Sequence, residues 1–386
     1  MSLPETVEMI RSLVAEPSVS SPDPRHDQSN RAVVDRLAEW AEHLGFRAEV
    51  VPLATDPSKA NLIATLGDGE GGLVLSGHTD TVPTEAAGWA TDPWELTERD
   101  EGTLYGLGSA DMKGFFGAAL TAAARFAAGD LKAPLTIVGT ADEESSMDGA
   151  RQLLAEGRPR AAMVVVGEPT GLVPVRMHKG ILMHRVEVEG RSGHSSNPAL
   201  GANAIDGMMQ VIGALQAFRA ELGERREDAF EVPGATLNLG RIEGGDSPNR
   251  ICGQCALTYD VRVLPGMAPA QLRADLEARV RAALDPRLRV TLEELVESVP
   301  PFAIDEEAEA VALLRELTGR DPRAVMFCTE APFFQELGAQ TVICGPGSID
   351  VAHQPDEHVT RGQLQEAVDI YAQTIHAVCV EGRGPR

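Results

Sequence analysis

Three short apolar stretches of the chain stop abruptly at residues whose side chains bind metals or transfer protons. By itself, an acidic tripeptide such as Asp142-Glu143-Glu144 would indicate a solvated turn, because adjacent like charges repel one another. Open α/β sheets, however, present functional groups beyond the carboxyl ends of their strands, so we expect these groups to converge on one sheet edge. The stretches and the groups that follow them are residues 73–77 with His78 and Asp80, residues 135–140 with the three carboxylates, and residues 162–167 with Glu168.

The groups at these three strand ends form a mixed set of nitrogen and oxygen ligands. Such a set suits a hard or borderline divalent metal ion. Asp111 stands just before an alanine-rich helix that is predicted to run through residue 128, and alone it would be interpreted as the N-cap of that helix. In the company of the strand-end groups, Asp111 becomes a further candidate ligand.

The length and charge of the chain limit its architecture and its partners. At 386 residues the chain exceeds one typical core, so two domains are expected. Its 34 basic and 58 acidic residues give a net charge of −24, which argues against nucleic acid and anionic membranes as partners. No stretch reaches the roughly 18 apolar residues of a membrane span, and residues 1–16 form an acidic amphipathic segment unlike a signal peptide. We therefore expect a cytoplasmic enzyme.

The pattern of apolar residues changes after Glu168 and predicts an inserted domain. The predicted order of strand, helix, strand, strand, helix, strand is the split βαβ arrangement of ferredoxin-like domains. A later apolar run at 342–345 leads to His353 and returns the chain to the first domain. We predict a two-domain α/β protein, with a mixed-sheet domain in residues 1–175 and 299–386 and an insertion in residues 176–298. The predicted elements of the insertion are strands at 181–189, 236–242, 251–263 and 288–295 and helices at 203–222 and 268–284.

Two other motifs lack the spacing that their usual functions require. Cys252 and Cys255 look like half of a zinc site, but no second pair follows at zinc-finger spacing, so we interpret both as half-buried strand residues. Gly106 and Gly108 lack the third glycine of a dinucleotide-binding fingerprint, because Asp111 stands in its place. Neither motif therefore predicts a site.

Five motifs in a fixed order make the chain resemble the M20 family of co-catalytic metallopeptidases and amidohydrolases. They extend over nearly the whole chain, which makes the resemblance specific. Further motifs narrow it to members of the family that deacetylate N-acetyl amino acids. The five motifs lie at residues 77–83, 108–114, 141–144, 167–170 and 193–195, and the further ones at 178–180, 236–240, 249–252, 264–267, 328–333, 345–348 and 353–357.

The resemblance implies a site for two metal ions. Two such ions roughly 3.5–4 Å apart can share a water molecule, lower its pKa and polarise an acyl oxygen. Asp80 would orient His78, as metal-bound histidines usually require. The implied site holds two zinc ions, with cobalt as a possible substitute, through His78 and Glu168 on one ion, Glu144 and His353 on the other, and Asp111 between them.

The same resemblance assigns the proton transfers of an amide hydrolysis. Glu143 would be the general base, since its neighbour Glu144 is the ligand and Glu143 has no metal to bind. His194 would reach the site of a neighbouring subunit and donate a hydrogen bond to the oxyanion. The inserted domain would thus serve as a lid and as the interface of a homodimer.

The implied substrate is a small N-acyl amino acid with a carboxylate. Asn249, Arg262 and Gly347 would bind the substrate, and the planar guanidinium of Arg262 suits its carboxylate. For Glu330 two interpretations stay open: it contacts a cationic substrate side chain, or it supports the metal site from behind.

Several functions compete for this sequence. Within the family the alternatives are a general N-acyl amino acid deacylase, a desuccinylase and a carboxypeptidase. From another class comes a non-catalytic binding protein on the same fold. The presence of Glu143 together with all five candidate ligands speaks against that last possibility, because a binding protein has no chemical use for the complete set.

Overall fold

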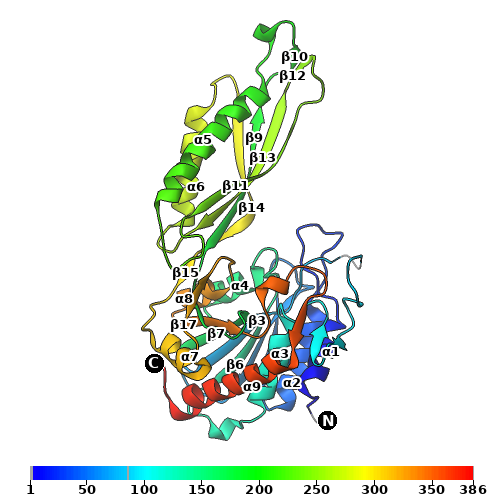
Figure 1. Ribbon diagram of the computed structural model, residues 1–386, viewed down its shortest axis with the longest axis vertical. Coiled ribbons are helices and arrows are strands. Elements are labelled where there is room, and N and C mark those ends of the chain that lie inside the picture. The colour runs from blue at the N-terminus through cyan, green and yellow to red at the C-terminus, as the bar shows by residue number, and fades with distance from the viewer. Residues whose placement is uncertain (1–2, 85–86, 386) are drawn as a thin grey trace. The chain divides into compact units, whose positions relative to one another are not determined.

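The computed structural model of the protein describes residues 3–84 and 87–385 (Figure 1). The chain divides into two compact units. The first unit comprises residues 1–176, 304–323 and 329–386, and the second comprises residues 177–303 and 324–328. The expected insertion at 176–298 falls almost wholly within the second unit, which extends further than expected, to residue 303 and over residues 324–328.

A mixed sheet forms the centre of the first unit. Six neighbouring strands of this nine-stranded sheet follow the order β1-β2-β6-β3-β7-β17. Strands β3, β6 and β7 run parallel, whereas β1 and β2 are antiparallel to their neighbours. The carboxyl ends of the three parallel strands therefore meet at one edge, as the sequence predicted. The bounds are β1 (Arg47–Pro52), β2 (Ala60–Leu66), β3 (Leu73–His78), β6 (Leu135–Thr140), β7 (Met163–Pro169) and β17 (Gln340–Gly345).

Helices and short strands complete the first unit. A three-stranded sheet has the order β18-β5-β4. The helices are α1 (Thr6–Val14), α2 (Arg31–His43), α3 (Lys113–Ala123), α4 (Asp148–Glu156), α7 (Glu309–Thr318), α8 (Ala331–Glu336) and α9 (Arg361–Ile375), and the short strands are β4 (Thr97–Arg99), β5 (Thr103–Tyr105) and β18 (His358–Thr360). Strands β8 (Val175–His178), β15 (Phe302–Ala303) and β16 (Arg323–Val325) lie where the chain passes between the units.

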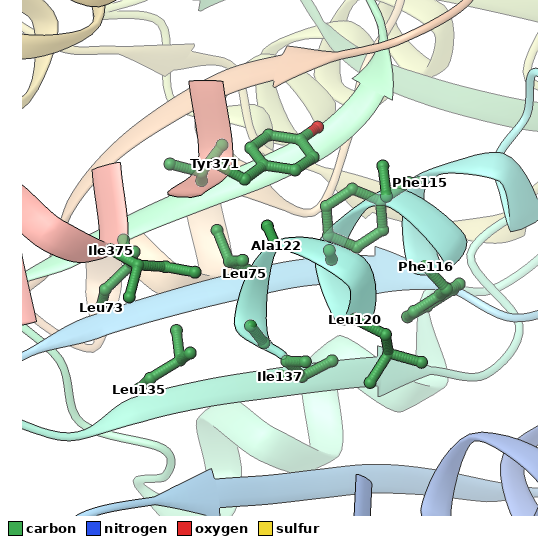
Figure 2. Packing of buried hydrophobic residues seen from close by; sticks show 14 of the residues in the cluster. Leu73, Leu75, Phe115, Phe116, Leu120, Ala122, Leu135, Ile137, Tyr371 and Ile375 are labelled. Atoms are coloured by element: carbon green, nitrogen blue, oxygen red, sulfur yellow. The ribbon is translucent and has the colours of Figure 1, made fainter. Parts of the chain in front are cut away.

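The core of the first unit packs helices α3 and α9 onto the central strands (Figure 2). Every residue of β3, β6 and β7 is buried, which explains their near-continuous apolar sequence. Phe115 of α3 packs edge-on against Tyr371 of α9, with ring centroids 5.6 Å apart. A side chain at Gly167 would place its Cβ 2.0 Å from the Phe115 ring, so only glycine fits at that point of β7. This packing fixes the strand ends that carry the functional groups.

The second unit is a four-stranded antiparallel sheet with two helices. The strand order β11-β13-β9-β14 is that of the ferredoxin-like arrangement, so the predicted fold class is confirmed. Alternate residues of β9 and β13 are buried against α5 and α6. The elements are β9 (Gly180–Glu189), β10 (Gly193–His194), α5 (Ala204–Glu224), β11 (Thr236–Gly244), β12 (Arg250–Ile251), β13 (Gln254–Val263), α6 (Pro269–Ala283) and β14 (Arg289–Val299).

Among the described residues, the structure contains no helix that is both long and apolar enough to cross a membrane. Its longest helix is α5, whose exposed residues alternate with the buried ones that face the sheet of the second unit.

Candidate metal centre

Two groups of side chains at the sheet edge have the geometry of metal ligands. The first group is His78, Asp111 and Glu168, and the second is Asp111, Glu144 and His353. Within each group, one ligand atom from every residue lies within 4.8 Å of the others. These five residues are the ones that the sequence singled out as metal ligands.

The chain brings these residues together from strand ends and from two loops. His78 is the last residue of β3, Glu168 lies near the end of β7, and Glu144 follows β6 in the turn before α4. Asp111 precedes α3, whose N-cap residue is Met112. Asp111 is therefore not the N-cap that it would suggest when considered alone, and its carboxylate faces the two histidines.

The carboxylate of Asp111 connects the two groups. Its Oδ1 lies 3.0 Å from Nε2 of His78, and its Oδ2 lies 3.3 Å from Nε2 of His353. Nε2 of His353 also lies 2.9 Å from Oε1 of Glu144. Since each oxygen of Asp111 faces a different imidazole, the carboxylate is placed to bridge two cations.

The backbone orients the imidazole ring of His78 through its Nδ1 nitrogen. Its Nδ1 lies 3.0 Å from the backbone carbonyl oxygen of Asp80, so Nδ1 carries the proton and donates it. Nε2 is then the nitrogen left to bind a metal ion, which would replace the hydrogen bond between Nε2 and Oδ1 of Asp111. The carboxylate of Asp80 is further away, with Oδ1 3.7 Å from Nδ1. Asp80 thus orients His78 mainly through its carbonyl, while its Oδ2 accepts the N–H of Glu144 at 3.1 Å.

The electrostatics of the group fit a bound dication. Burial, reinforced by the charge of Asp111, raises the pKa of Glu168 well above its usual value. Oε1 of Glu168 is buried and has no hydrogen-bond partner among the described residues. The carboxylates of Asp111 and Glu144 accept hydrogen bonds from His353 and raise its pKa to about 10. Buried carboxylates need a compensating charge, and a metal ion at each group would supply it.

Glu143 lies beside the ligands without belonging to either group. It is half-buried, and its residue directly precedes the ligand Glu144. Burial and the charge of Glu168 raise the pKa of Glu143 well above its usual value. Burial also raises the pKa of Glu144, so the two adjacent carboxylates differ only in that Glu144 belongs to a ligand group.

Sequence reasoning missed the part that Glu357 plays in holding Asp111. The Glu357 carboxylate is 1% exposed and accepts backbone N–H groups of Gly108 at 3.1 Å and of Ala110 and Asp111 at 2.9 Å. It thereby fixes the loop that carries the shared carboxylate. The only signal in the sequence was its place in the motif that also contains His353.

The remaining predicted site residues divide between the two units. His194 lies on the exposed β10, Arg262 pairs with Asp260 at 3.0 Å, and Asn249 accepts from Ser247 at 2.6 Å. These three residues belong to the second unit, and the ligand groups belong to the first.

Glu330 and Gly347 belong to the first unit with the ligands. Glu330 is 1% exposed at the start of α8, and burial raises its pKa to about 7. Gly347 has a φ of 86°, and a Cβ there would lie 2.9 Å from Cβ of Ala110, next to Asp111. The ligand His78 is equally buried at 1% exposed, so burial fits both interpretations of Glu330.

Comparisons with known proteins identify the family of the chain. Residues 74–377 match the model of peptidase family M20/M25/M40, so the chain belongs to this family. The chain is 42% identical to the acetylornithine deacetylase of Pasteurella multocida (strain Pm70) over 98% of this chain and 99% of that protein. It is 44% identical to the acetylornithine deacetylase of Proteus mirabilis (strain HI4320) over 98% of each chain. A tripeptidase from Staphylococcus aureus has a similar fold, with a TM-score of 0.76, 20% identity and coverage of 97% and 98%.

Proposed function

We propose that the chain is a metal-dependent amide hydrolase that converts N2-acetyl-L-ornithine into L-ornithine and acetate. The observation that carries the proposal is the pair of ligand groups that share Asp111. The substrate is inferred from the identity of over 40% to two acetylornithine deacetylases across nearly the full chain.

The metal ions of the proposal are two zinc ions, for which cobalt is a possible substitute. His78, Asp111 and Glu168 would hold one ion, and Asp111, Glu144 and His353 the other. When bound, they supply Lewis-acid chemistry that makes a water molecule more acidic and an acyl oxygen more electrophilic. Imidazole and carboxylate ligands suit zinc and leave positions open for water and substrate.

Glu143 is proposed to move the protons. Its carboxylate takes a proton from the attacking water and later gives it to the amine that leaves the acyl carbon. Glu143 lies in the same turn as the ligand Glu144, which keeps the base next to the reacting atoms. Because Glu143 belongs to neither ligand group, it is free for this role.

His194 is proposed to donate a hydrogen bond to the oxyanion. The backbone N–H of Ser196 lies 3.2 Å from Nδ1 of His194 and donates to it. In the neutral ring the proton therefore sits on Nε2, which makes Nε2 a donor. His194 is exposed, so this donor can be offered to another molecule. A donor aimed at developing negative charge stabilises the transition state.

The carboxylate of the substrate is assigned to Arg262 and Asn249. The Arg262 guanidinium is a planar fork that matches a carboxylate. Gly347 is also proposed to contact the substrate, because it has no side chain and its backbone lies beside the loop of Asp111. Glu330 is proposed to support the ligands from behind or to contact a cationic substrate side chain, since its burial fits both roles.

The substrate assignment predicts a clear preference among acyl amino acids. The zinc-loaded protein should hydrolyse N-acetyl-L-ornithine with a kcat/KM at least about tenfold above N-acetyl-L-methionine and N-succinyl-diaminopimelate, a difference of about 1.4 kcal/mol. Initial rates of acetate and succinate release at matched concentrations measure it. A preference for another substrate would keep the hydrolase and reject acetylornithine, and hydrolysis of none would favour a binding protein.

A homodimer through the second unit is part of the proposal. Leu200, Ile205 and Met209 lie on or beside α5 and are 60%, 41% and 67% exposed. Exposed large apolar side chains that gather on one element are typical of an interface. Light scattering should therefore give twice the mass of the 41.1 kDa chain.

If His194 serves the site of the partner subunit, two inactive variants should complement each other. His194→Ala is expected to lower kcat about 100-fold through loss of the oxyanion donor, and Glu143→Gln removes the base. Co-expression of the two gives mixed dimers in which one site has both groups, so activity should recover to about a quarter of wild type for random pairing. Recovery no higher than the parent variants would contradict a shared site.

A further inference from the structure

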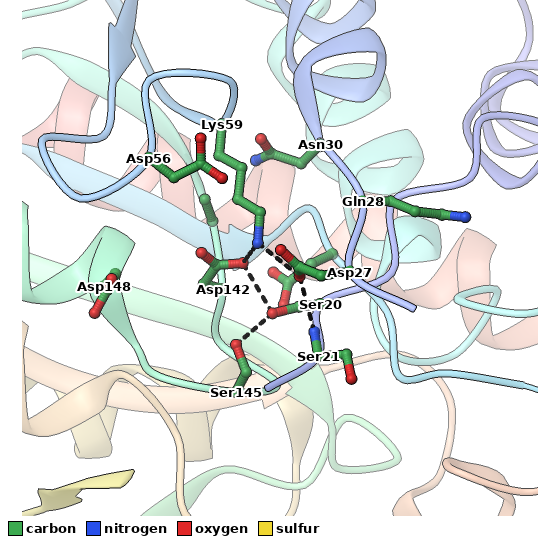
Figure 3. Close-up of polar contacts among 12 residues, drawn as sticks. Ser20, Ser21, Asp27, Gln28, Asn30, Asp56, Lys59, Asp142, Ser145 and Asp148 are labelled. Atoms are coloured by element: carbon green, nitrogen blue, oxygen red, sulfur yellow. Dashed lines mark hydrogen bonds and ion pairs between the residues drawn. The ribbon is translucent and has the colours of Figure 1, made fainter. Parts of the chain in front are cut away.

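A buried cation that lies just before a neighbouring strand contacts Asp142, in the turn after β6 (Figure 3). The cation is Lys59, the residue just before β2, and its side chain is 5% exposed. Its Nζ lies 2.6 Å from Oδ1 of Asp142 and 2.8 Å from Oδ1 of Asp27. Asp142 directly precedes Glu143, so the ion pair ends one peptide bond away from the proposed general base.

Asp142 adopts a backbone conformation that needs such support. Its φ is 60°, in the left-handed region that residues with a side chain rarely occupy. Conformations of this kind persist when the surrounding contacts determine them. The carbonyl oxygen of Asp142 accepts the N–H groups of Ser146 at 3.0 Å and Met147 at 2.7 Å. Lys59 fixes the side chain of the same residue, so both ends of Asp142 are held.

Two further contacts tie the same turn to the rest of the unit. Ser20 donates from Oγ to Oδ1 of Asp142 at 2.8 Å and also forms a hydrogen bond with Ser145. Asn61, two residues after Lys59, accepts the N–H of Ala141 at 3.0 Å. The segment on either side of Glu143 is thus attached to β2 and to the loop of Ser20.

The charge of Lys59 is matched by its surroundings. Burial disfavours the ammonium, but hydrogen bonds to Asp142 and Asp27 outweigh that effect and raise the pKa of Lys59. A buried ion pair of this kind adds little net stability compared with apolar residues of the same size. The ion pair is therefore better explained by its effect on the geometry of the turn than by a gain in stability.

We propose that Lys59 is a positioning residue for the amide hydrolysis, which acts through Asp142 to fix the direction of Glu143. The inference rests on the proposed function, because it requires Glu143 to act as the base. Glu144 lies in the same turn but has a contact of its own, because its N–H donates to Oδ2 of Asp80 at 3.1 Å. The loss of Lys59 should therefore misplace the base more than the metal ligands. The alternative is that the ion pair only stabilises the fold.

The variant Lys59→Met removes the cation and keeps the length of the side chain. We expect kcat for N-acetyl-L-ornithine to fall about 10- to 100-fold, the size of effect that a displacement of about 1 Å causes. KM and the zinc content of the purified protein should stay close to wild type. A kcat within twofold of wild type, or a loss of zinc that parallels the loss of turnover, would overturn the proposal.

The double variant Lys59→Met, Asp142→Asn guards against misfolding caused by an unpaired buried carboxylate. It removes the cation and the more buried of its two partner charges, and leaves Asp27, whose side chain is 25% exposed. It should show a similar fall in kcat with zinc still bound. A double variant with wild-type kcat would overturn the proposal, since the turn would then need no ion pair. The conservative variant Lys59→Arg keeps the cation and should retain more turnover than Lys59→Met.

A matched control removes an ion pair elsewhere in the first unit. Arg31 and Asp35 form an exposed pair at 2.7 Å on α2, and Arg31→Met should leave kcat, KM and zinc content unchanged. If the zinc-loaded wild type itself releases no acetate, the proposed function and the positioning role fail together. If wild type, Arg31→Met and Lys59→Met all turn over equally, only the positioning role fails.

Discussion

Replacing Glu143 by glutamine is expected to lower kcat for N-acetyl-L-ornithine by about 1000-fold, within the range of general acid–base catalysis. Glutamine has nearly the same shape but cannot accept a proton from the attacking water. Glu143 belongs to neither ligand group, so the variant should bind as much zinc as wild type. KM should change little, because the substrate contacts are assigned to other residues.

The neighbouring carboxylate provides the matched comparison for Glu143. Glu144 lies 2.9 Å from His353 within a ligand group, so Glu144→Gln should lower the zinc content, whereas Glu143→Gln should not. Acetate release and zinc analysis of the same samples measure both effects. A Glu143→Gln protein that keeps more than about a tenth of the wild-type kcat would show that another group accepts the proton.

The strand ends of the first unit could be predicted because their signals are local. The apolar run at 73–77 and its histidine became β3, which ends at His78. The run at 135–140 became β6, which places Glu143 and Glu144 just beyond its end. Parallel neighbours then bring these groups to one edge, a rule that needs no knowledge of side-chain contacts.

The supporting contacts could not be predicted because they join residues far apart in the chain. Lys59 and Asp142 are separated by 83 positions, and Glu357 and Asp111 by 246. Asp142 and Glu357 also stand next to other acidic residues in the sequence. A single sequence offers no pattern that assigns a partner to one of several adjacent charges. Burial of Lys59 to 5% exposure is a consequence of the fold and leaves no periodic signal in the residues around it.

One strand predicted in the second unit is interrupted, because backbone N–H groups from other segments donate to its carbonyl oxygens. The strand predicted at 251–263 is divided into β12 and β13 at Cys252 and Gly253. The carbonyl of Cys252 accepts the N–H of Ala204 at 2.9 Å, and that of Gly253 accepts the N–H of Gly190 at 2.8 Å. The apolar alternation continues across this break, so the sequence reads as one strand. Cys252 and Cys255 are free thiols that are buried, not half-buried as predicted. Cys255 lies on β13 as expected, whereas Cys252 lies in the break.

Removal of the metal ions is expected to abolish turnover almost completely. The ions would supply several kcal/mol of transition-state stabilisation, and each 1.4 kcal/mol is a factor of ten, so acetate release should fall at least about 100-fold. Asp111 is shared between the two ligand groups, so the two ions should bind in a coupled way. Activity should therefore rise with added zinc and level off near about two equivalents per chain.

The most direct measurement is acetate release from N-acetyl-L-ornithine by chelator-stripped protein during titration with zinc, with binding followed by calorimetry on the same samples. We predict negligible release without metal and full release at about two bound ions per chain, with cobalt able to replace zinc. Undiminished acetate release from protein free of metal would contradict a two-metal hydrolase. Full activity with ions bound elsewhere than at the two ligand groups that share Asp111 would also contradict it.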